Sequence, residues 1–153
     1  MLPGLYNRSL CSCFISHPVV RPVIDELIEK FADDKGLKIV DICLSESIRE
    51  NHLLRYDAGI EEFIALIDNA DYVVTNSLHG TIFSIIMHKN FATFIRKNGC
   101  RKIEELLKLL SLENRLCCAD LHVLDNNIDY EDVEKKLDAY REKSELFIRK
   151  YIN

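Results

Sequence analysis

The residues with the clearest chemical potential lie in one short stretch, Thr75 to Thr81, which reads Thr-Asn-Ser-Leu-His-Gly-Thr. Ser77 is a good helix N-cap residue and can accept a hydrogen bond from the Gly80 amide. The remaining free amides of a first helical turn, together with the positive end of the helix dipole, can bind an anion. A phosphate or carboxylate is therefore one candidate ligand for this stretch.

Its other residues fit the same interpretation. His79 would lie in the first turn, where it could donate a hydrogen bond to the anion or transfer a proton near neutral pH. Gly80 would let a ligand approach the backbone closely. The side chains of Thr75, Asn76 and Thr81 offer further hydrogen bonds. A purely structural alternative is a capped helix start whose histidine only hydrogen-bonds the neighbouring loop. The residues alone do not decide between the two.

Strand-like and helix-like segments alternate around this stretch. The expected strands are 9–16, 37–44, 71–75, 91–95 and 115–118, and the expected helices are 21–35, 60–69, 79–88, 101–110 and a long last helix capped by Asp129. Such alternation predicts a parallel sheet with right-handed crossovers. We therefore predict a single α/β domain over residues 1–153, a Rossmann-like parallel sheet of about five strands with flanking helices. Residues 1–8 are a leader without an assigned structure.

The position of the polar stretch in this arrangement suits a ligand site. In open α/β sheets, ligands bind beyond the carboxyl ends of the strands, where loops lead into helices. Residues 71–75 form a short apolar run, as expected of a strand inside a parallel sheet. Residues 79–88 are apolar nearly all round, which predicts a buried helix. Residues 45–59 are polar and aperiodic, which predicts a surface excursion.

The long last helix carries apolar or aromatic residues that repeat by threes and fours. Ser144 fills the gap in a series made of Val133, Leu137, Tyr140, Phe147 and Tyr151. Because the repeat spans fewer than three heptads, it favours an ordinary packing face over a coiled coil.

Composition excludes several classes of protein. The chain has 153 residues, 48% hydrophobic and 29% charged, as in one ordinary globular domain. Its net charge is −5, which argues against a broad basic face for nucleic acid. No apolar run reaches the roughly 18 residues of a membrane-spanning helix. Because residues 1–4 lack the features of a signal peptide, we expect a cytoplasmic location.

The six cysteines do not have the spacing of a metal site. One pair is Cys-x-Cys, another is adjacent, and neither has a histidine at zinc-finger spacing. We expect reduced structural thiols and no metal, at positions Cys11, Cys13, Cys43, Cys100, Cys117 and Cys118. His17, His52 and His122 are expected at the surface.

Residues 70–86 closely resemble the signature of the polysaccharide pyruvyl transferase family. Its usual form is an Ala-Asp strand, then Thr-Asp-Ser-Phe-His-Gly-Thr, an apolar helix and a Lys-Pro-Phe-like turn. Here that turn is Lys-Asn-Phe at 89–91. Similar flanking segments lie at 61–64, 101–107, 112–115 and 129–131, and the resemblance is specific from about Ile60 to Arg115.

The resemblance implies a two-domain, GT-B-like transferase of which this chain is the C-terminal half. Such enzymes move the enolpyruvyl unit of phosphoenolpyruvate onto two hydroxyls of a sugar or glycan acceptor, as a cyclic ketal, in cell-surface polysaccharide (exopolysaccharide) biosynthesis. Phosphoenolpyruvate is the donor substrate, and no cofactor is implied. The resemblance places His79 at the phosphoenolpyruvate site as the catalytic residue. The substrate-binding residues would be Thr75, Asn76, Ser77, Leu78, Gly80 and Thr81.

Two departures from the family pattern affect these expectations. Asn76 replaces the usual Asp and Leu78 the usual Phe, and an amide can hydrogen-bond but cannot act as a base. An arginine is expected to hold the phosphate, either Arg96, Arg101 or a residue outside this chain. The acceptor site should also come from the other half, so we expect the isolated chain to be incomplete as an enzyme.

Two other interpretations remain open at this point. The first is a nucleotide-sugar glycosyltransferase domain of the same GT-B shape. The second is a non-catalytic truncated or oligomerising module, whose apolar face and last helix would form a homodimer.

Overall fold

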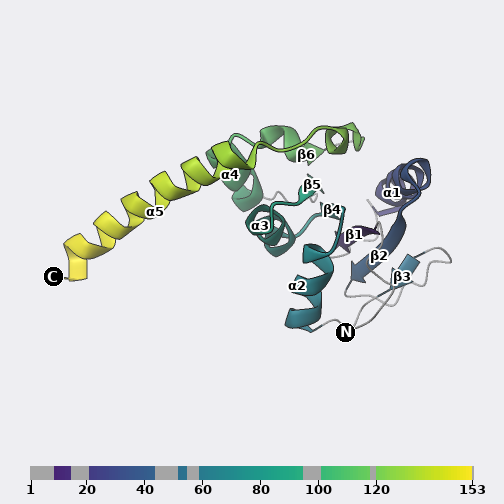
Figure 1. The fold of residues 1–153 in the computed structure, drawn as a ribbon, viewed down its shortest axis with the longest axis horizontal. Coiled ribbons are helices and arrows are strands. Elements are labelled where there is room, and N and C mark those ends of the chain that lie inside the picture. The colour runs from purple at the N-terminus through teal and green to yellow at the C-terminus, as the bar shows by residue number, and fades with distance from the viewer. Residues whose placement is uncertain are drawn as a thin grey trace.

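The computed structural model describes residues 9–14, 21–43, 52–54, 59–94, 101–117 and 120–152. In these residues six strands form one sheet in the order β3-β2-β1-β4-β5-β6, and every neighbouring pair is parallel (Figure 1). The strands are β1 (Ser9–Phe14), β2 (Lys38–Cys43), β3 (His52–Leu54), β4 (Tyr72–Thr75), β5 (Asn90–Phe94) and β6 (Leu116–Cys117).

The helices agree with the expected segments to within two residues. They are α1 (Arg21–Lys35), α2 (Ile60–Asp68), α3 (Leu78–Ile86), α4 (Arg101–Leu109) and α5 (Tyr130–Ile152), with two short 3-10 turns, η1 (Glu113–Arg115) and η2 (His122–Asp125). The predicted α/β fold with a parallel sheet is confirmed. The expected leader, residues 1–8, lies outside the described residues, as do His17, Arg96, Cys100 and Cys118.

The predicted number of strands was wrong, because the sheet has six strands and not five. The additional strand is β3, which lies inside the segment expected to be a surface excursion. It has only three residues, His-Leu-Leu, and forms the edge of the sheet by pairing with Ile39, Val40 and Asp41 of β2. Three residues are too few to show a hydrophobic period, so the sequence pattern carries no signal for this strand.

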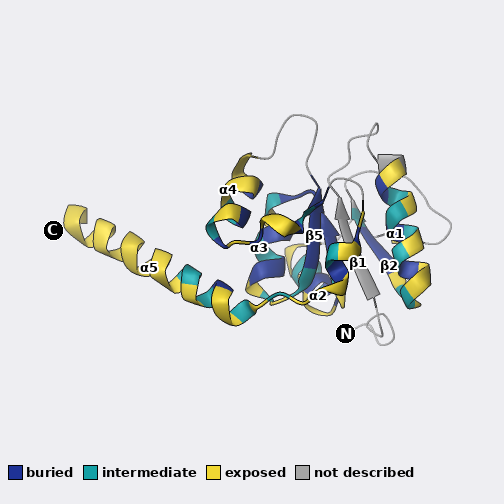
Figure 2. Cartoon of the chain, turned by 90° about the horizontal axis from the view of Figure 1, so that it is seen from above, coloured by how far each residue is buried: buried dark blue, intermediate teal, exposed yellow. Residues whose placement is uncertain are grey.

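Helices cover both faces of the sheet, and Figure 2 shows the buried residues concentrated between them. On one face Val73 and Phe91 pack against residues of α2, α3, α4 and the start of α5. On the other face Val74 and Ala92 pack against α1 and η2. Val73, Val74 and Phe91 are fully buried, which explains why β4 and β5 are apolar on both sides.

The strand order reverses direction between β1 and β4. From β1 the chain proceeds to β2 and β3 on one side, then returns through α2 to β4 on the other side of β1. β1 pairs with β4 from Leu10 opposite Tyr72 to Cys13 opposite Thr75. This is the doubly wound order in which ligands bind at the carboxyl ends of the strands that flank the reversal.

The buried helix expected at 79–88 is buried on one side only. Its buried residues are Gly80, Thr81, Ser84 and Ile85, whereas Ile86 is 60% exposed. The small polar side chains therefore face the sheet. Thr81 and Ser84 tolerate burial because each hydroxyl donates a hydrogen bond to the carbonyl oxygen four residues earlier.

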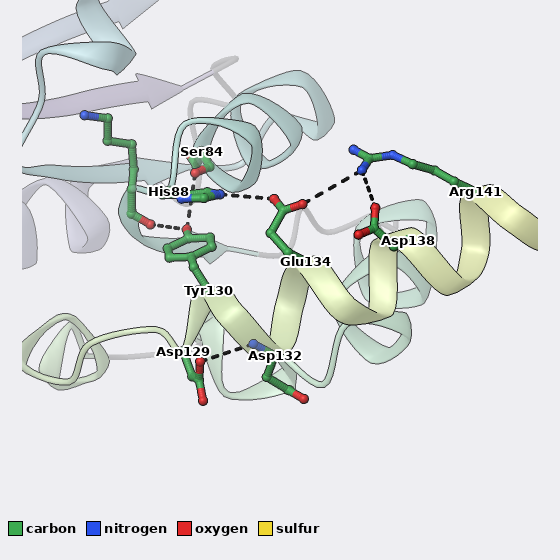
Figure 3. Close-up of polar contacts among 9 residues, drawn as sticks. Ser84, His88, Asp129, Tyr130, Asp132, Glu134, Asp138 and Arg141 are labelled. Carbon is green, nitrogen blue, oxygen red and sulfur yellow. Dashed lines mark hydrogen bonds and ion pairs between the residues drawn. The ribbon is translucent and has the colours of Figure 1, made fainter.

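The beginning of α5 is attached to the end of α3 (Figure 3). The Tyr130 hydroxyl donates to the carbonyl oxygens of Ser84 and Lys89, and the His88 ring stacks on the Tyr130 ring with centroids 4.5 Å apart. His88 Nε2 lies 3.1 Å from Glu134 Oε1. His88 has a left-handed backbone (φ 53°), which ends α3 and is unusual for a non-glycine residue.

The expected cap of α5 is confirmed, but the expected packing face is only partly present. Asp129 Oδ1 accepts a hydrogen bond from the Asp132 amide at 3.2 Å. Val133 is buried and Leu137 packs against the core, whereas the later members of the same series, Phe147 and Tyr151, are exposed. The rest of α5 projects away from the domain in both overall views.

Arg115 is a buried cation whose hydrogen bonds connect β5 to the segment that follows β6. Its guanidinium donates to Asn90 Oδ1 at 2.6 Å and to the carbonyl oxygens of Val123 and Asn126 at 3.0 and 2.7 Å. Burial lowers the pKa of Arg115, since desolvation disfavours the charged form. These hydrogen bonds offset that cost, and the buried thiol of Cys117 donates to the Arg115 carbonyl oxygen at 3.7 Å.

We predict that Arg115→Lys lowers the free energy of unfolding by about 2–3 kcal/mol, because one ammonium cannot reach all three acceptors and leaves buried carbonyl oxygens without donors. Urea denaturation measures this loss. Arg101→Lys is the matched control, since the Arg101 side chain is 89% exposed and its replacement should change stability little. Equal stabilities for the two variants would contradict the assigned role.

Because the Tyr130 phenol is buried, we predict that the free energy of unfolding falls at alkaline pH. Burial raises the pKa of the Tyr130 phenol, so the folded protein keeps a proton that the unfolded chain releases above about pH 10. Stability should therefore fall as pH rises above 10, by up to about 1.4 kcal/mol per pH unit from this group. Urea midpoints between pH 8 and 11 should fall less steeply in Tyr130→Phe than in the wild type, and parallel curves would contradict the prediction.

Candidate functional site

The turn between β4 and α3 contains only Asn76 and Ser77, and hydrogen bonds within the turn fix its shape. The Thr75 hydroxyl oxygen accepts from the Ser77 amide at 3.0 Å. Ser77 is the N-cap of α3 as predicted, and its side chain accepts from the Gly80 amide at 3.5 Å. The Thr81 hydroxyl donates to the Ser77 carbonyl oxygen at 3.0 Å.

Gly80 is required by packing between α3 and β4. A Cβ atom at Gly80 would lie 2.4 Å from Thr75 Oγ1 and 3.1 Å from Thr75 Cβ, closer than real Cβ contacts. The sequence suggested that Gly80 leaves room for a ligand. In the structure the Thr75 side chain fills the space beside the Gly80 Cα, so the glycine lets the helix start approach the strand.

The seven predicted site residues fall into two groups. Thr75, Ser77, Gly80 and Thr81 are buried and build the turn itself. Asn76 is buried as well, with 8% of it exposed, whereas Leu78 is half-buried against the core and His79 is exposed.

The first turn of α3 presents unused hydrogen-bond donors. No described residue accepts a hydrogen bond from the amides of Leu78 and His79, which are among the groups a helix start leaves without an internal partner. The His79 side chain likewise makes no hydrogen bond or ion pair within the described part of the chain. The interpretation of His79 as a residue that only binds its neighbouring loop therefore finds no support among those residues.

This turn lies where the fold favours ligands. Thr75 is the last residue of β4 and pairs with Cys13 of β1, so the turn leaves the sheet next to the reversal of strand order. α4 begins at Arg101, seven residues after Phe94, the last residue of β5. The Arg101 side chain forms an ion pair with Glu105 at 2.7 Å. Arg96, the other candidate for phosphate binding, lies outside the described residues.

Thr93 is a polar residue of this region that the sequence analysis did not identify. It pairs with Thr75 across β4 and β5 and is fully buried, and its hydroxyl oxygen has no hydrogen-bond partner among the described residues. In sequence it is one residue of an otherwise ordinary strand, Asn-Phe-Ala-Thr-Phe. Only the register of the sheet brings it beside the turn, so no sequence signal could have revealed it.

The described residues contain no group of three or more His, Cys, Asp or Glu side chains able to hold a metal ion. Among these residues there is also no helix with both the length and the apolar character needed to cross a membrane.

The strand order and the ligand edge define a Rossmann-like α/β domain of the type found in GT-B-like transferases and epimerases. A UDP-GlcNAc 2-epimerase from Methanocaldococcus jannaschii, solved with UDP-GlcNAc and UDP, matches with a TM-score of 0.57 and 14% identity over 88% of this chain and 39% of that chain. The glycotransferase of kitacinnamycin matches with a TM-score of 0.58 and 13% identity over 97% of this chain and 44% of that chain. This chain thus spans about two fifths of either protein.

The sequence itself identifies the family. A profile of the polysaccharide pyruvyl transferase family matches residues 21–98, which is just over half of the chain and includes the whole turn after β4. The chain therefore belongs to this family. A search of curated protein sequences finds no match.

We predict that Gly80→Ala lowers the free energy of unfolding by about 1–3 kcal/mol, because the new methyl group overlaps the Thr75 side chain. Thr75→Ala removes the overlapping hydroxyl, so the double variant should lose about 1 kcal/mol less than the sum of the single variants. Urea denaturation of all four proteins gives this coupling energy. Additive losses would show that Thr75 does not determine the need for glycine.

Proposed function

We propose that this chain is the donor-binding part of a polysaccharide pyruvyl transferase. It binds phosphoenolpyruvate at the start of α3, and the complete enzyme transfers the pyruvyl unit to two sugar hydroxyls as a ketal. The observation that carries the proposal is the pair of free amides at Leu78 and His79, beside the exposed His79 side chain, at the reversal of strand order. Family membership supports the same donor.

The chemistry of phosphoenolpyruvate suits this arrangement. The molecule is a compact anion with a phosphate and a carboxylate, and the amides and dipole of a helix start bind such groups without a cation. The uncharged Asn76 adds no repulsion and can donate a hydrogen bond through its amide. Leu78, packed partly against the core, holds the first turn in place.

The reaction can be written with all atoms balanced. A proton adds to the methylene carbon of phosphoenolpyruvate, which becomes a methyl group and leaves C2 electrophilic. One sugar hydroxyl adds to C2 and loses its proton, the C2–O bond to phosphate breaks, and inorganic phosphate leaves with one of the released protons. The second hydroxyl then closes the ketal with loss of its own proton, which replaces the one added to the methylene carbon. In this proposal His79 stabilises charge on the phosphate or relays one of these protons.

The remaining parts of the active site are assigned to a segment beyond this chain. The chain spans about two fifths of the two solved structures it matches, and the family resemblance implies a second domain that faces the ligand edge. We therefore place the binding of the sugar or glycan acceptor there. We also propose a cytoplasmic location, as expected from the sequence, because phosphoenolpyruvate is an intracellular metabolite.

A nucleotide sugar is the second candidate ligand. The M. jannaschii epimerase was solved with UDP-GlcNAc and UDP, and a diphosphate is also an anion that a helix start can bind. A direct comparison of the two ligands distinguishes these functions.

We predict saturable binding of phosphoenolpyruvate to the 153-residue chain in calorimetric and thermal-shift titrations. His79→Ala should weaken this binding about tenfold or more, as expected for loss of a hydrogen bond to a charged group. Its melting temperature without ligand should stay unchanged, because the His79 side chain is exposed. His122→Ala, another exposed histidine, is the matched control and should bind normally.

UDP-GlcNAc in the same titrations tests the alternative. Binding of UDP-GlcNAc that His79→Ala weakens, with no response to phosphoenolpyruvate, would favour the nucleotide-sugar function. Equal binding of phosphoenolpyruvate by the wild type and His79→Ala would remove His79 from the site. A well-folded wild type that binds neither ligand would contradict a donor site formed by this chain alone.

A further inference from the structure

Thr93 carries a buried hydroxyl that lacks a hydrogen-bond partner, close to the turn after β4. The residue is fully buried, and its Oγ1 atom makes no hydrogen bond within the described part of the chain. The other buried hydroxyls between α3 and the sheet, those of Thr75, Ser77, Thr81 and Ser84, each form a hydrogen bond of 2.7–3.5 Å. Thr93 is therefore the exception in a polar layer whose other members are paired.

The register of the sheet places the Thr93 side chain next to that of Thr75. The two residues are partners in the pairing of β5 with β4. Because side chains alternate along a strand, Thr93 shares the face of Phe91 and Thr75 shares the face of Val73, which α3 covers. Neighbouring strands lie about 4.8 Å apart, so a rotation about the Thr93 Cα–Cβ bond can bring one hydroxyl to the other.

Packing alone does not require a hydroxyl at this position. Valine has nearly the same shape as threonine and suits a β-strand equally well. A buried hydroxyl without a partner lowers stability, and a valine would not carry this cost. The cost is explained if the hydroxyl gains its partner in another state of the protein, and ligand sites are where local rules of this kind are broken.

The Thr75 hydroxyl holds an amide that lies at the start of α3. Thr75 Oγ1 accepts a hydrogen bond from the Ser77 amide at 3.0 Å, and Ser77 directly precedes the first turn of the helix. The next two amides, of Leu78 and His79, have no acceptor among the described residues. The Ser77 amide is thus a third donor at the helix start, occupied by Thr75 when no anion is bound.

We infer that Thr93 is a positioning residue that releases the Ser77 amide to the bound anion. When an oxygen of phosphoenolpyruvate accepts from the Ser77 amide, the Thr93 hydroxyl donates to Thr75 Oγ1 in its place. Three consecutive amides then hold the anion, and the Thr93 hydroxyl has its partner. The inference rests on the proposed phosphoenolpyruvate site at the start of α3.

The exchange makes the affinity depend on a residue that the anion does not touch. In the empty site the unpaired Thr93 hydroxyl lowers stability, and this cost disappears on binding, which favours the bound state. Without that hydroxyl, release of the Ser77 amide would take a donor from Thr75 Oγ1 and supply none in return. Removal of the Thr93 hydroxyl should therefore stabilise the empty protein and weaken binding.

Thr93→Val is the test variant, since it removes the hydroxyl and keeps the shape of the side chain. We expect its melting temperature without ligand to rise by about 2–4 °C. In calorimetric titrations its affinity for phosphoenolpyruvate should fall about tenfold. Thr93→Ser, which keeps the hydroxyl, should bind like the wild type, although the loss of a buried methyl group lowers its melting temperature.

Thr81→Val is the matched control for stability, because it makes the same change at a buried hydroxyl that has a partner. The Thr81 hydroxyl donates to the Ser77 carbonyl oxygen at 3.0 Å, so its removal should lower the melting temperature. A fall of the same size in Thr93→Val would show that the Thr93 hydroxyl is already paired in the empty protein, and would overturn the inference.

Two further measurements test the exchange of donors itself. In nuclear magnetic resonance titrations of the wild type with phosphoenolpyruvate, the amide signals of Ser77, Leu78 and His79 should all shift. In Thr93→Val the Ser77 signal should shift little. In a Thr75→Val background, which lacks the acceptor, Thr93→Val should no longer weaken binding.

The outcomes separate this inference from the proposed function. Wild-type binding with equal affinity in Thr93→Val, or with a Ser77 signal that does not shift, would overturn the exchange and leave the phosphoenolpyruvate site intact. Equal losses from Thr93→Val with and without Thr75 would also overturn it. A folded wild type that does not bind phosphoenolpyruvate would contradict the proposed function, and the inference would fall with it.

Discussion

The contact between the Thr75 side chain and the Gly80 backbone is the constraint on which the candidate site depends. The Thr75 hydroxyl holds the Ser77 amide and also fills the space that a side chain at Gly80 would need. The strand and the helix can therefore be joined by only two residues. Because the Ser77 cap then takes up the Gly80 amide, the donors left free are those of Leu78 and His79. Packing within the turn thus decides which groups a ligand can reach.

α3 connects this turn to the attachment of α5. At its start the Gly80 carbonyl oxygen accepts from the Ser84 hydroxyl at 2.7 Å, and the Ser84 carbonyl oxygen in turn accepts from Tyr130 of α5. The left-handed backbone of His88 ends α3 at the point where its ring can stack on Tyr130. The stacking and the contact with Glu134 offset the cost of that conformation. One short helix therefore positions both the candidate ligand site and the root of the projecting helix.

Most of the fold could be predicted because its elements carry a clear period or cap. The helix 21–35, the strand 71–75, the Ser77 cap and the Asp129 cap were all identified from residue types at fixed spacing. The strand β3 could not be, because its three residues pair only at the sheet edge. The exposure of Ile86 was also not predicted, because the spacing of apolar residues in a helix does not show which of them the neighbouring elements cover.

The position of the turn after β4 could be predicted from the sequence, whereas the hydrogen bonds that its residues make could not. The motif located the turn correctly at the carboxyl edge, because a capped helix after a buried strand has few other positions in an α/β sheet. Hydrogen bonding then assigned Thr75 and Thr81 to the turn itself, which depends on side-chain rotamers that no spacing reveals. The strand order that places the turn beside β1, and Thr93 beside Thr75, depends on pairing between distant segments.

Because Asn76 replaces the family's usual Asp, this turn has one fewer side chain that could accept or donate a proton. Among residues 75–81, His79 has the one ionisable side chain, and Asn76 can orient a ligand but cannot accept its proton. A neutral residue next to a helix start also removes a negative charge that would oppose an incoming phosphate. Any proton that this turn supplies or removes must therefore pass through His79. A second acid or base, where the reaction needs one, must come from residues outside the turn.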